Sequence, residues 1–525
     1  MGWGLLGAAS QVGARRLHTA AQSGTGTAAS RPDYLLAIDQ GTTSTRAILF
    51  DASGHIHHTA RIALRPIYPR PGWVEHDPEE IWQAVVATCR AAIAAAQGRP
   101  IAAIGITNQR ETTVLWERSS GRPVHNAIVW QDRRTAALCD SWRKTGLGDA
   151  VSERTGLVID PYFSASKIRW LLDRVPGLRE RAAAGEIAFG TIDTFLLWRL
   201  TAGKRHATDV TNASRTMLFD LHRLAWDDEL LQAFGIPPAL LPEIRDTDAD
   251  YGETAPGLFG APIPIAGVAG DQQAATIGQA CFRPGMVKST YGTGAFALLH
   301  TGARPAVSNN RLLTTVAYRL GGETAYALEG SIFIAGAAVQ WLRDRLRAVS
   351  AAPETQALAE AADPRQRVYF VPAFAGLGAP HWAADARAAL SGLTAECGQP
   401  EIARATLESV GFQTRDLVEA MAADCGMPIG ALRVDGGLAA SDWAMQFVAD
   451  ILPAAVARPH SLETTAWGAA YVAGLSRGLC PPPEAMMARW SATRRFAPAM
   501  DAAEREERYA GWRRAVAGVL AAAAR

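Results

Sequence analysis

The sequence predicts an α/β protein with two domains that share one duplicated plan and enclose a cleft. Three observations support this prediction. With 525 residues the chain exceeds the roughly 250 to 300 residues at which a single hydrophobic core stops growing. Apolar segments of strand length alternate along it with segments of helical periodicity. A succession of strand, Gly/Thr-rich turn and strand occurs near the start and again after residue 284, which indicates an ancient duplication.

The first copy of the plan has the order strand, strand, strand, helix, strand. The first three strands are predicted to form an antiparallel meander, and the last is apolar enough to be buried on both faces. The helix begins at "HDPEEIW", where Asp77 suits the N-cap, Pro78 the first helical position and Glu80 a capping box. The predicted strands are residues 34–39, 45–51, 55–62 and 101–107.

The second copy begins at "PGMVKSTYGTGAFALLHTG", again a strand, a Gly/Thr turn and a strand. Residues 314–320 supply the third strand of this copy, and a further strand, a helix and a buried-looking strand follow. These later segments are residues 323–331, 333–346 and 367–374. The chain continues with a helix at 401–422, a strand and turn at 432–437 and a helix at 442–452.

The boundary between the copies is predicted near residues 276–284, which gives domains at 33–280 and 281–525. Residues 1–32 contain no acid, three arginines and much Ala, Ser, Thr and Gly. We expect them to form a flexible leader on a cytoplasmic protein. Their composition also allows the alternative of a mitochondrial transit peptide.

The overall composition is that of a soluble globular protein, with 48% apolar and 20% charged residues. The net charge of +1 gives no reason to expect a nucleic acid or an anionic membrane as partner. No apolar run approaches the roughly 18 residues of a membrane span. The six cysteines are widely spaced, so reduced and mostly buried thiols are predicted, without a disulfide framework or zinc site.

Chemistry is expected where the two Gly/Thr turns face each other. "DQGTTST", which starts at Asp39, offers backbone N–H groups and hydroxyls that suit phosphate oxygens, and "YGTG", which ends at Gly294, repeats the offer. Either turn alone could be an ordinary hairpin. Two turns at matching places in a duplicated chain instead favour a phosphate clamp.

The first turn is flanked by one acid and one base. Arg46 could form bidentate bonds to phosphate, or it could be a solvated strand arginine. Asp39 ends an apolar strand and is best explained as a ligand of Mg²⁺ or its waters, because magnesium sites use one or two carboxylates with phosphate oxygens. The chain has no GxxxxGK[ST], so a P-loop is excluded.

Two further clusters of polar residues follow apolar strands. Asp271, in "AGDQQAA", could accept the proton of an attacking hydroxyl or cap the helix that follows, and the two roles are compatible. In "GITNQRETT", Arg110 and Glu111 could bind the hydroxyls of a polyol, or form a surface salt bridge of little stability. Trp130, Tyr162 and Phe296 could each be core residues or ligand walls.

Glycines before a helix in the second half complete the pattern. In "VDGGLAASDW", Gly436 and Gly437 would let a nucleotide approach the backbone closely, although the loop could equally be a tight turn. Together these features predict an ATP-dependent phosphotransferase that acts on a small hydroxylated substrate.

The motifs resemble those of the FGGY family of carbohydrate kinases, from about Tyr34 to about Val519. The matching segments include "DQGTTSTRA", "GITNQRETT", "TGLVIDPYFSASK", "TNASRTMLFD", "AGDQQAA", "STYGTGAF", "LEGSIFIAGAAVQWLRD" and "RVDGGLAASDWAMQFVADIL". "NQRET" and the tyrosine loop separate the chain from the sugar kinases of the family and resemble its glycerol-phosphorylating members.

This resemblance implies a two-domain fold of the actin-like, ribonuclease-H-like ATPase class, in which ATP and glycerol meet in the cleft. The activity implied is ATP-dependent formation of sn-glycerol 3-phosphate and ADP, the first step of glycerol utilisation, with Asp271 as general base. A homo-oligomer, either dimer or tetramer, is also expected.

The resemblance also assigns residues to each ligand. The glycerol site would comprise Thr42, Arg110, Glu111, Trp130, Tyr162, Asp271, Gln272 and Phe296. The ATP site would comprise Thr42, Thr43, Ser44, Arg46, Thr293, Gly336, Gln340, Gly437 and Ser441. Mg²⁺ would bridge the phosphates near Asp39 and Asp271.

Three departures from the family pattern are present. Ser441 stands where the family commonly has an asparagine that contacts adenine, and its side chain is shorter. Residues 252–267 lack the arginine of a fructose-1,6-bisphosphate loop, and no phosphorylatable histidine matches that of relatives. We therefore predict that neither form of control operates. Alternatives to the implied activity are a kinase of another short polyol or triose, such as dihydroxyacetone or erythritol, and a catalytically silent scaffold.

Overall fold

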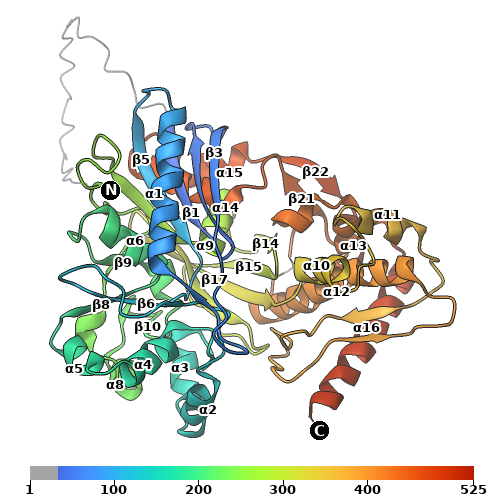
Figure 1. The fold of residues 1–525 in the computed structure, drawn as a ribbon. Helices are drawn as coiled ribbons and strands as arrows, with labels where there is room; N and C mark the ends of the chain where they lie inside the picture. The colour runs from blue at the N-terminus through green and yellow to red at the C-terminus, as the bar shows by residue number, and fades with distance from the viewer. Residues whose placement is uncertain (1–33, 428, 525) are drawn as a thin grey trace, which may run out of the picture.

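The chain forms two lobes, each built around one β-sheet, as Figure 1 shows. This computed structural model describes residues 34–427 and 429–524, so the predicted leader at residues 1–32 lies outside the described residues. The α/β class and the two-lobed organisation predicted from the sequence are confirmed.

The sheet of the first lobe has five strands in the order β13-β5-β1-β2-β3. β2 pairs antiparallel with both β1 and β3, which confirms the meander, whereas β5 and β13 run parallel to β1. β1 is buried along its whole length, as its apolar sequence predicts. The strands are β1 (Tyr34–Gln40), β2 (Ser44–Phe50), β3 (Ile56–Ala63), β5 (Ile101–Asn108) and β13 (Ile265–Gly270).

Helix α1 (Pro78–Ala95) begins where the sequence predicts, with Pro78 at its first position. Asp77 is the N-cap, and its Oδ1 accepts a hydrogen bond of 2.8 Å from the backbone N–H of Glu79. The predicted capping box with Glu80 does not form, because the cap bonds one residue earlier.

The sheet of the second lobe has seven strands in the order β16-β17-β15-β14-β20-β21-β22. Its centre repeats the first sheet: β15 is antiparallel to β14 and to β17, and β20 and β21 run parallel to β14. The strands are β14 (Val287–Tyr291), β15 (Ala295–Gly302), β16 (Leu313–Leu320), β17 (Glu323–Ile332), β20 (Leu432–Asp435), β21 (Val456–Pro459) and β22 (Ala492–Phe496).

The strand predicted at residues 314–320 is confirmed as β16, the third strand of this copy along the chain. It lies at the edge of the sheet, and β17 takes the place beside β15 that β3 has beside β2, because β16 and β17 form a hairpin. Within residues 367–374, only β18 (Tyr369–Val371) is a strand, and it pairs with β19 (Ala389–Ser391) outside the main sheet. β20 fills the expected position beside β14 instead.

Helices cover the sheets and carry the loops around the cleft. Those of the first half are α2 (Ala136–Lys144), α3 (Gly148–Thr155), α4 (Ser164–Arg174), α5 (Leu178–Ala183), α6 (Ile192–Leu200), α7 (Val210–Ala213), α8 (Asp228–Phe234) and α9 (Asp271–Gly278). Those of the second half are α10 (Gly336–Asp344), α11 (Glu354–Ala361), α12 (Gln399–Cys425), α13 (Asp442–Ile451), α14 (Thr464–Ser476), α15 (Pro483–Arg489) and α16 (Ala502–Ala523).

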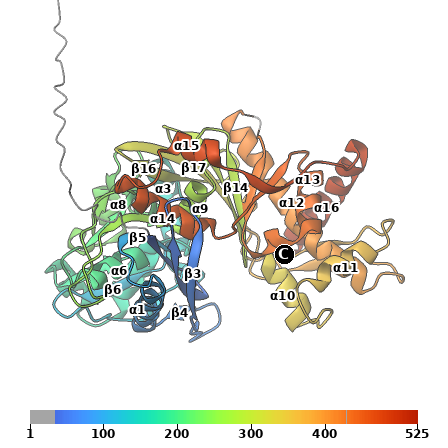
Figure 2. The same ribbon diagram turned by 90° about the horizontal axis from the view of Figure 1, so that it is seen from above.

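Helix α14 joins the two halves, because it belongs to the second half in sequence but packs on β1, β5 and β13 of the first sheet. Figure 2 shows α14 and α15 on the lobe that contains β3 and β5. Where α14 crosses α9, a Cβ on Gly468 would lie 1.8 Å from the Ala274 carbonyl oxygen, so only glycine permits this approach. The predicted division at residue 280 stays a prediction.

The six cysteines are free thiols in the described part of the chain, and Cys397 and Cys425 are the two that are not fully buried. Among the described residues, no helix is long and apolar enough to cross a membrane.

Candidate active site

The polar clusters that follow apolar strands meet at one edge of the first sheet. In the parallel ladder Asp39 lies opposite Thr107, and Gly270 lies opposite Asn108. The segments that leave β1, β5 and β13 therefore begin side by side. Open parallel sheets bind ligands outside the carboxyl ends of their strands, and Arg110 and Asp271 lie at this place.

The first Gly/Thr turn links β1 to β2. The N–H of Gly41 donates to the Ser44 carbonyl at 3.0 Å, and the Thr43 carbonyl accepts from Leu64 at 3.0 Å. The Thr42 hydroxyl accepts a hydrogen bond of 2.9 Å from Nε1 of Trp130, which ties the turn to the predicted substrate wall. Thr43 is exposed and Ser44 is buried.

Arg46 was predicted either to bind phosphate or to be a solvated strand arginine, and it is instead paired with two carboxylates. Its guanidinium forms ion pairs with Asp39, directly opposite in the β1–β2 ladder, and with Glu463, just before α14. The Arg46 side chain is 26% exposed. Asp39 is consequently engaged with an arginine, and Arg46 links the first sheet to the helix that crosses over from the second half.

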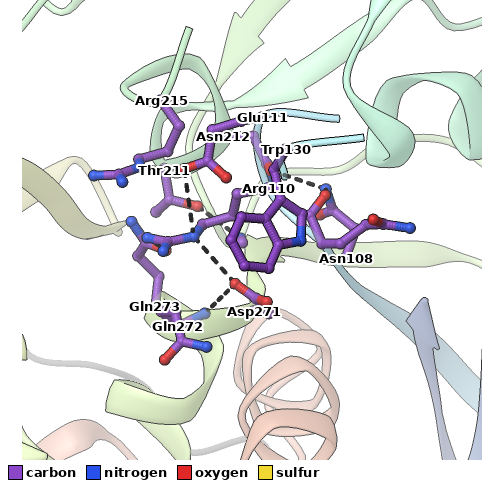
Figure 3. Close-up of polar contacts among 12 residues, drawn as sticks. Asn108, Arg110, Glu111, Trp130, Thr211, Asn212, Arg215, Asp271, Gln272 and Gln273 are labelled. Carbon is purple, nitrogen blue, oxygen red and sulfur yellow. Dashed lines mark hydrogen bonds and ion pairs between the residues drawn. The ribbon is translucent and has the colours of Figure 1, made fainter. Parts of the chain in front are cut away.

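Arg110 and Glu111 are buried residues of the cleft, so the alternative of a surface salt bridge is wrong. Arg110 lies between Glu111 and Asp271, as Figure 3 shows. Its Nε is 3.1 Å from Asp271 Oδ1 and 3.9 Å from Glu111 Oε1, and its Nη1 is 3.2 Å from Gln273 Oε1. Glu111 has φ of +60°, a strained conformation of the kind that concentrates at functional sites.

Asp271 is the first residue of α9, and Gly270 is the N-cap. Its Oδ1 accepts a hydrogen bond of 2.7 Å from the backbone N–H of Gln272. The N-cap role considered for Asp271 is therefore wrong, because Gly270 holds that position. The side chain is 31% exposed. Removal from bulk water raises its pKa to about 6, against the opposing positive charges of Arg110 and Lys288.

Three aromatic side chains form a continuous wall beside these charges. The Trp130 ring lies 5.6 Å from Tyr162 and 5.9 Å from Phe296, both edge to face, and the Arg110 guanidinium is 5.8 Å from the Phe296 ring. Trp130 and Tyr162 line a cavity of about 690 Å³ between the lobes, together with Thr293 of the second turn. Thr293 of the second turn therefore lies at the cavity, and Thr42 of the first turn contacts its wall through the hydrogen bond with Trp130.

The second turn is held against the start of α10. The Thr293 carbonyl accepts from the N–H groups of Ala335 and Ala337 at 2.9 and 3.0 Å. A Cβ on Gly336 would lie 2.5 Å from the Gly292 carbonyl oxygen, which requires glycine at the helix start. Gln340 lies exposed one turn further along α10.

Gly437 and Ser441 line a second cavity, of about 430 Å³, beside Val339 of α10. Ser441 is the N-cap of α13 and accepts from the Ala444 N–H at 3.3 Å, while its hydroxyl donates to Gln356 Oε1 at 3.3 Å. Gln356 of α11 is thus a polar residue of this cavity that the sequence patterns did not identify, because it belongs to none of the matched motifs.

Three buried charged residues were also missed. Arg215 pairs with Glu111 and Glu329, Glu329 pairs with Arg110, and the Lys288 ammonium donates to Gln272 Oε1 at 2.5 Å and to Thr290 Oγ1 at 2.9 Å. Burial lowers the pKa of Lys288 to about 8, although the carboxylates of Asp435 and Asp271 favour its charged form. Each of these residues lies in one of the sequence segments quoted above, so the family resemblance could have pointed to them.

The two carboxylates predicted to hold a divalent cation, Asp39 and Asp271, are at the ends of β1 and β13, with β5 between these strands. Among the described residues no group of three or more His, Cys, Asp or Glu side chains could hold a metal ion. Magnesium needs no such group, since it is commonly held by one or two carboxylates, waters and phosphate oxygens. The donor set therefore fits magnesium supplied with a nucleotide.

Two lobes with a Gly/Thr turn in each, and a buried arginine paired with a carboxylate beside an aromatic wall, are the arrangement of a kinase of small hydroxylated molecules. The model of the N-terminal domain of the FGGY family of carbohydrate kinases matches residues 34–278, and that of the C-terminal domain matches residues 287–477. The chain belongs to the FGGY family of carbohydrate kinases.

Similar proteins share nearly the full described length. The chain is 62% identical over 491 residues to a glycerol kinase of Methylobacterium nodulans, which covers 93% of this chain and 98% of that relative. It is 60% identical over 494 residues to a glycerol kinase of Rhizobium meliloti, with 93% and 99% covered.

Solved structures show the same fold. The crystal structure of Plasmodium falciparum glycerol kinase with ADP superposes with a TM-score of 0.87 at 36% identity, over 93% of this chain and 98% of that chain. A gluconate kinase from Lactobacillus acidophilus, with a TM-score of 0.80 and 23% identity over 92% and 95% of the two chains, shares the fold.

Proposed function

We propose that the chain is a kinase that transfers the γ-phosphate of ATP to glycerol, giving sn-glycerol 3-phosphate and ADP. The proposal is carried by the convergence of Arg110, Glu111 and Asp271 at a pocket of aromatic walls, in a chain about 60% identical to proteins named glycerol kinase. Charged groups in a desolvated site bind hydroxyls strongly, and the aromatic faces cover the carbon chain.

Asp271 is proposed as the general base. Its carboxylate is partly exposed and can accept the proton of the terminal hydroxyl while that oxygen attacks the γ-phosphorus. A pKa raised to about 6 leaves it ionised at neutral pH and strong enough to take this proton. Arg110, held 3.1 Å away, orients the carboxylate.

The remaining site residues are proposed to divide between the ligands. Thr42, Arg110, Glu111, Trp130, Tyr162, Gln272 and Phe296 contact glycerol with Asp271. Thr42, Thr43, Ser44, Arg46, Thr293, Gly336, Gln340, Gly437 and Ser441 contact ATP. Mg²⁺, held near Asp39 and Asp271 with phosphate oxygens, would supply neutralisation of phosphate charge. For Arg46 to reach a phosphate it must leave one of its two carboxylate partners.

The organisation of the chain is proposed to follow this division. Apart from Phe296, the glycerol site lies within residues 33–280 together with the first phosphate turn, and the rest of the nucleotide site lies within residues 281–525. We further propose a cytoplasmic homo-oligomer, dimer or tetramer. Ile62, Ile67 and Tyr68 are exposed at β3 and the loop after it, which is an apolar surface that self-association would cover. Light scattering of the purified protein measures the oligomeric state.

Substrate-dependent ADP release tests the proposed function. Glycerol, dihydroxyacetone and erythritol are compared at equal concentrations with ATP and Mg²⁺, and glycerol is expected to give the highest kcat/KM. A higher value for another polyol would reassign the substrate. No release above the substrate-free rate with any of them would favour a catalytically silent scaffold.

A further inference from the structure

Glu329 of β17 is completely buried and bonds two arginines of the first lobe. Its Oε2 lies 2.5 Å from Arg110 Nη1, and its Oε1 lies 3.1 Å from Arg110 Nη2. The same Oε1 accepts from Arg215 Nη2 at 2.8 Å. One carboxylate from the second sheet therefore holds both guanidinium groups.

Arg215 passes this constraint on to Glu111. Its Nε donates to Glu111 Oε1 at 2.7 Å, and its guanidinium lies 5.6 Å from the Tyr162 ring and 5.4 Å from the Phe163 ring. Arg215 is itself fully buried, so it cannot turn toward solvent to find another partner. Glu111 sits in its strained conformation with this arginine as its closest ionic partner.

Two arginines that share one carboxylate depend on its charge. Although burial acts to raise it, Arg110 and Arg215 hold the pKa of Glu329 below its ordinary value, so this group stays ionised. Without it, two buried guanidinium groups would face each other with one carboxylate fewer between them, an arrangement that is strongly unfavourable in a desolvated site.

The backbone of Glu329 is fixed as firmly as its side chain. β17 lies between β15 and β16, and Glu329 is paired with Leu298 on one side and Leu313 on the other. The carboxylate cannot shift without moving a strand that is hydrogen-bonded on both edges. The Glu329 carboxylate is thus held in a fixed position by the sheet of the second lobe.

We propose that Glu329 is a positioning residue for the polyol site: it aims Arg110 directly and Glu111 through Arg215. The inference rests on the proposed function, because it assigns the hydroxyl-binding role to Arg110 and Glu111. Glu329 does not touch the substrate. It sets the direction of the groups that do, and it does so from the second sheet.

The test is Glu329→Gln, which keeps the shape of the side chain and removes its charge. The KM for glycerol is expected to rise on the order of 10- to 100-fold, because a site loosened by about 1 Å loses this much. The KM for ATP is expected to stay within about twofold, because the ATP residues lie outside this network.

The split between KM and kcat gives a second readout. Asp271 has its own ion pair with Arg110 Nε, at 3.1 Å, which does not involve Glu329. We therefore expect kcat to fall much less in Glu329→Gln than the KM for glycerol rises. A general packing defect would instead lower kcat and raise the KM of both substrates.

Glu408→Gln is the matched control. Glu408 of α12 is also a buried carboxylate between two arginines, with Oε1 2.9 Å from Arg508 Nη1 and 3.5 Å from Arg404 Nε, but it lies away from the cleft. Its KM for glycerol and its kcat are expected to match those of the wild type within about twofold.

Several results would overturn the inference. One is an unchanged KM for glycerol in a folded Glu329→Gln variant, and another is an equal rise in the KM of both substrates. If Glu329→Gln does not fold, Glu329→Asp keeps the charge but is too short to reach both arginines, and it carries the same comparison. Failure of both variants to fold would make Glu329 a folding determinant and reject the positioning role. Wild-type ADP release with glycerol tests the proposed function separately.

Discussion

The polyol side and the nucleotide side of the cleft are built by different means. The proposed polyol side is made of buried charged side chains that bond one another and come from both lobes, such as Arg110 with Asp271 and with Glu329. At the second Gly/Thr turn, on the proposed nucleotide side, the contacts are made by backbone: the Thr293 carbonyl bonds two N–H groups, and Gly336 lies against Gly292. Buried ion pairs therefore mark one side, and close backbone contacts at glycine mark the other.

This difference follows from what each side is proposed to bind. Hydroxyl groups of a small polyol are distinguished by the direction of donors and acceptors, which side chains supply when they are fixed in place. Phosphates and ribose are large and polar, and the backbone must approach them closely, which side chains would prevent. The comparison predicts that substitutions of the charged side chains mainly affect the binding and turnover of glycerol. Substitutions of the glycines are predicted to affect mainly the binding of ATP.

The largest effect is expected from Asp271→Asn. The amide cannot accept the proton of the attacking hydroxyl, so kcat is expected to fall on the order of 10²- to 10⁴-fold. Binding of glycerol, measured by calorimetry, is expected to stay within about tenfold, because Arg110 and Glu111 remain. Turnover close to wild type would contradict the role of Asp271 as base.

Gly336→Ala tests the glycine side. Its Cβ would lie 2.5 Å from the Gly292 carbonyl oxygen, so the start of α10 must move away from the Thr293 turn. The KM for ATP is expected to rise about tenfold, since a displacement of about 1 Å can cost as much or more, while the KM for glycerol changes little. Gly518→Ala in α16 is the control, because its Cβ meets nothing within 4 Å. An equal effect on both substrates would break the comparison.

The pH dependence should report the charged side alone. Asp271, with its pKa raised to about 6, must be ionised to act as base. The value of kcat/KM for glycerol is therefore expected to be constant and maximal above pH 7 and to fall about tenfold per pH unit below pH 6. A limb near pH 4, the ordinary value of an aspartate, would show that Asp271 is not the group that titrates.

Ser441→Ala should have the smallest effect. The variant loses the N-cap of α13 and the hydrogen bond to Gln356, which is expected to lower the free energy of unfolding by about 1 kcal/mol. The KM for ATP is expected to rise by no more than about fivefold, because backbone forms most of this side. Thermal unfolding and ATP titration measure the two quantities. A larger rise than that of Gly336→Ala would reverse the ranking.

Sequence reasoning found the parts of this molecule that local pattern determines. The meander around Gly41, the cap at Asp77 and the polar residues after buried strands are features of short segments, and their positions were confirmed. The family resemblance assigned Arg110 and Asp271 to one site, and they lie 3.1 Å apart because parallel strands place their carboxyl ends together.

The parts that were missed depend on contacts between distant segments. Arg215 and Glu329 are 114 positions apart and reveal their role only as a pair. Arg46 could be assigned to phosphate or solvent from its strand, but its partner Glu463 is 417 positions away. The segment that forms β16 was predicted as a strand, but its place at the edge of the sheet depends on its pairing with β17.

The packing of α14 on the first sheet also constrains how the protein is made. Nine of its residues from Thr464 to Gly474 are buried, and they cover strands that the ribosome completes more than 190 residues earlier. During synthesis one apolar face of the N-terminal sheet therefore stays uncovered until α14 has left the ribosome. A stop codon anywhere before residue 464 would leave an early, otherwise complete sheet exposed to chaperones and to aggregation.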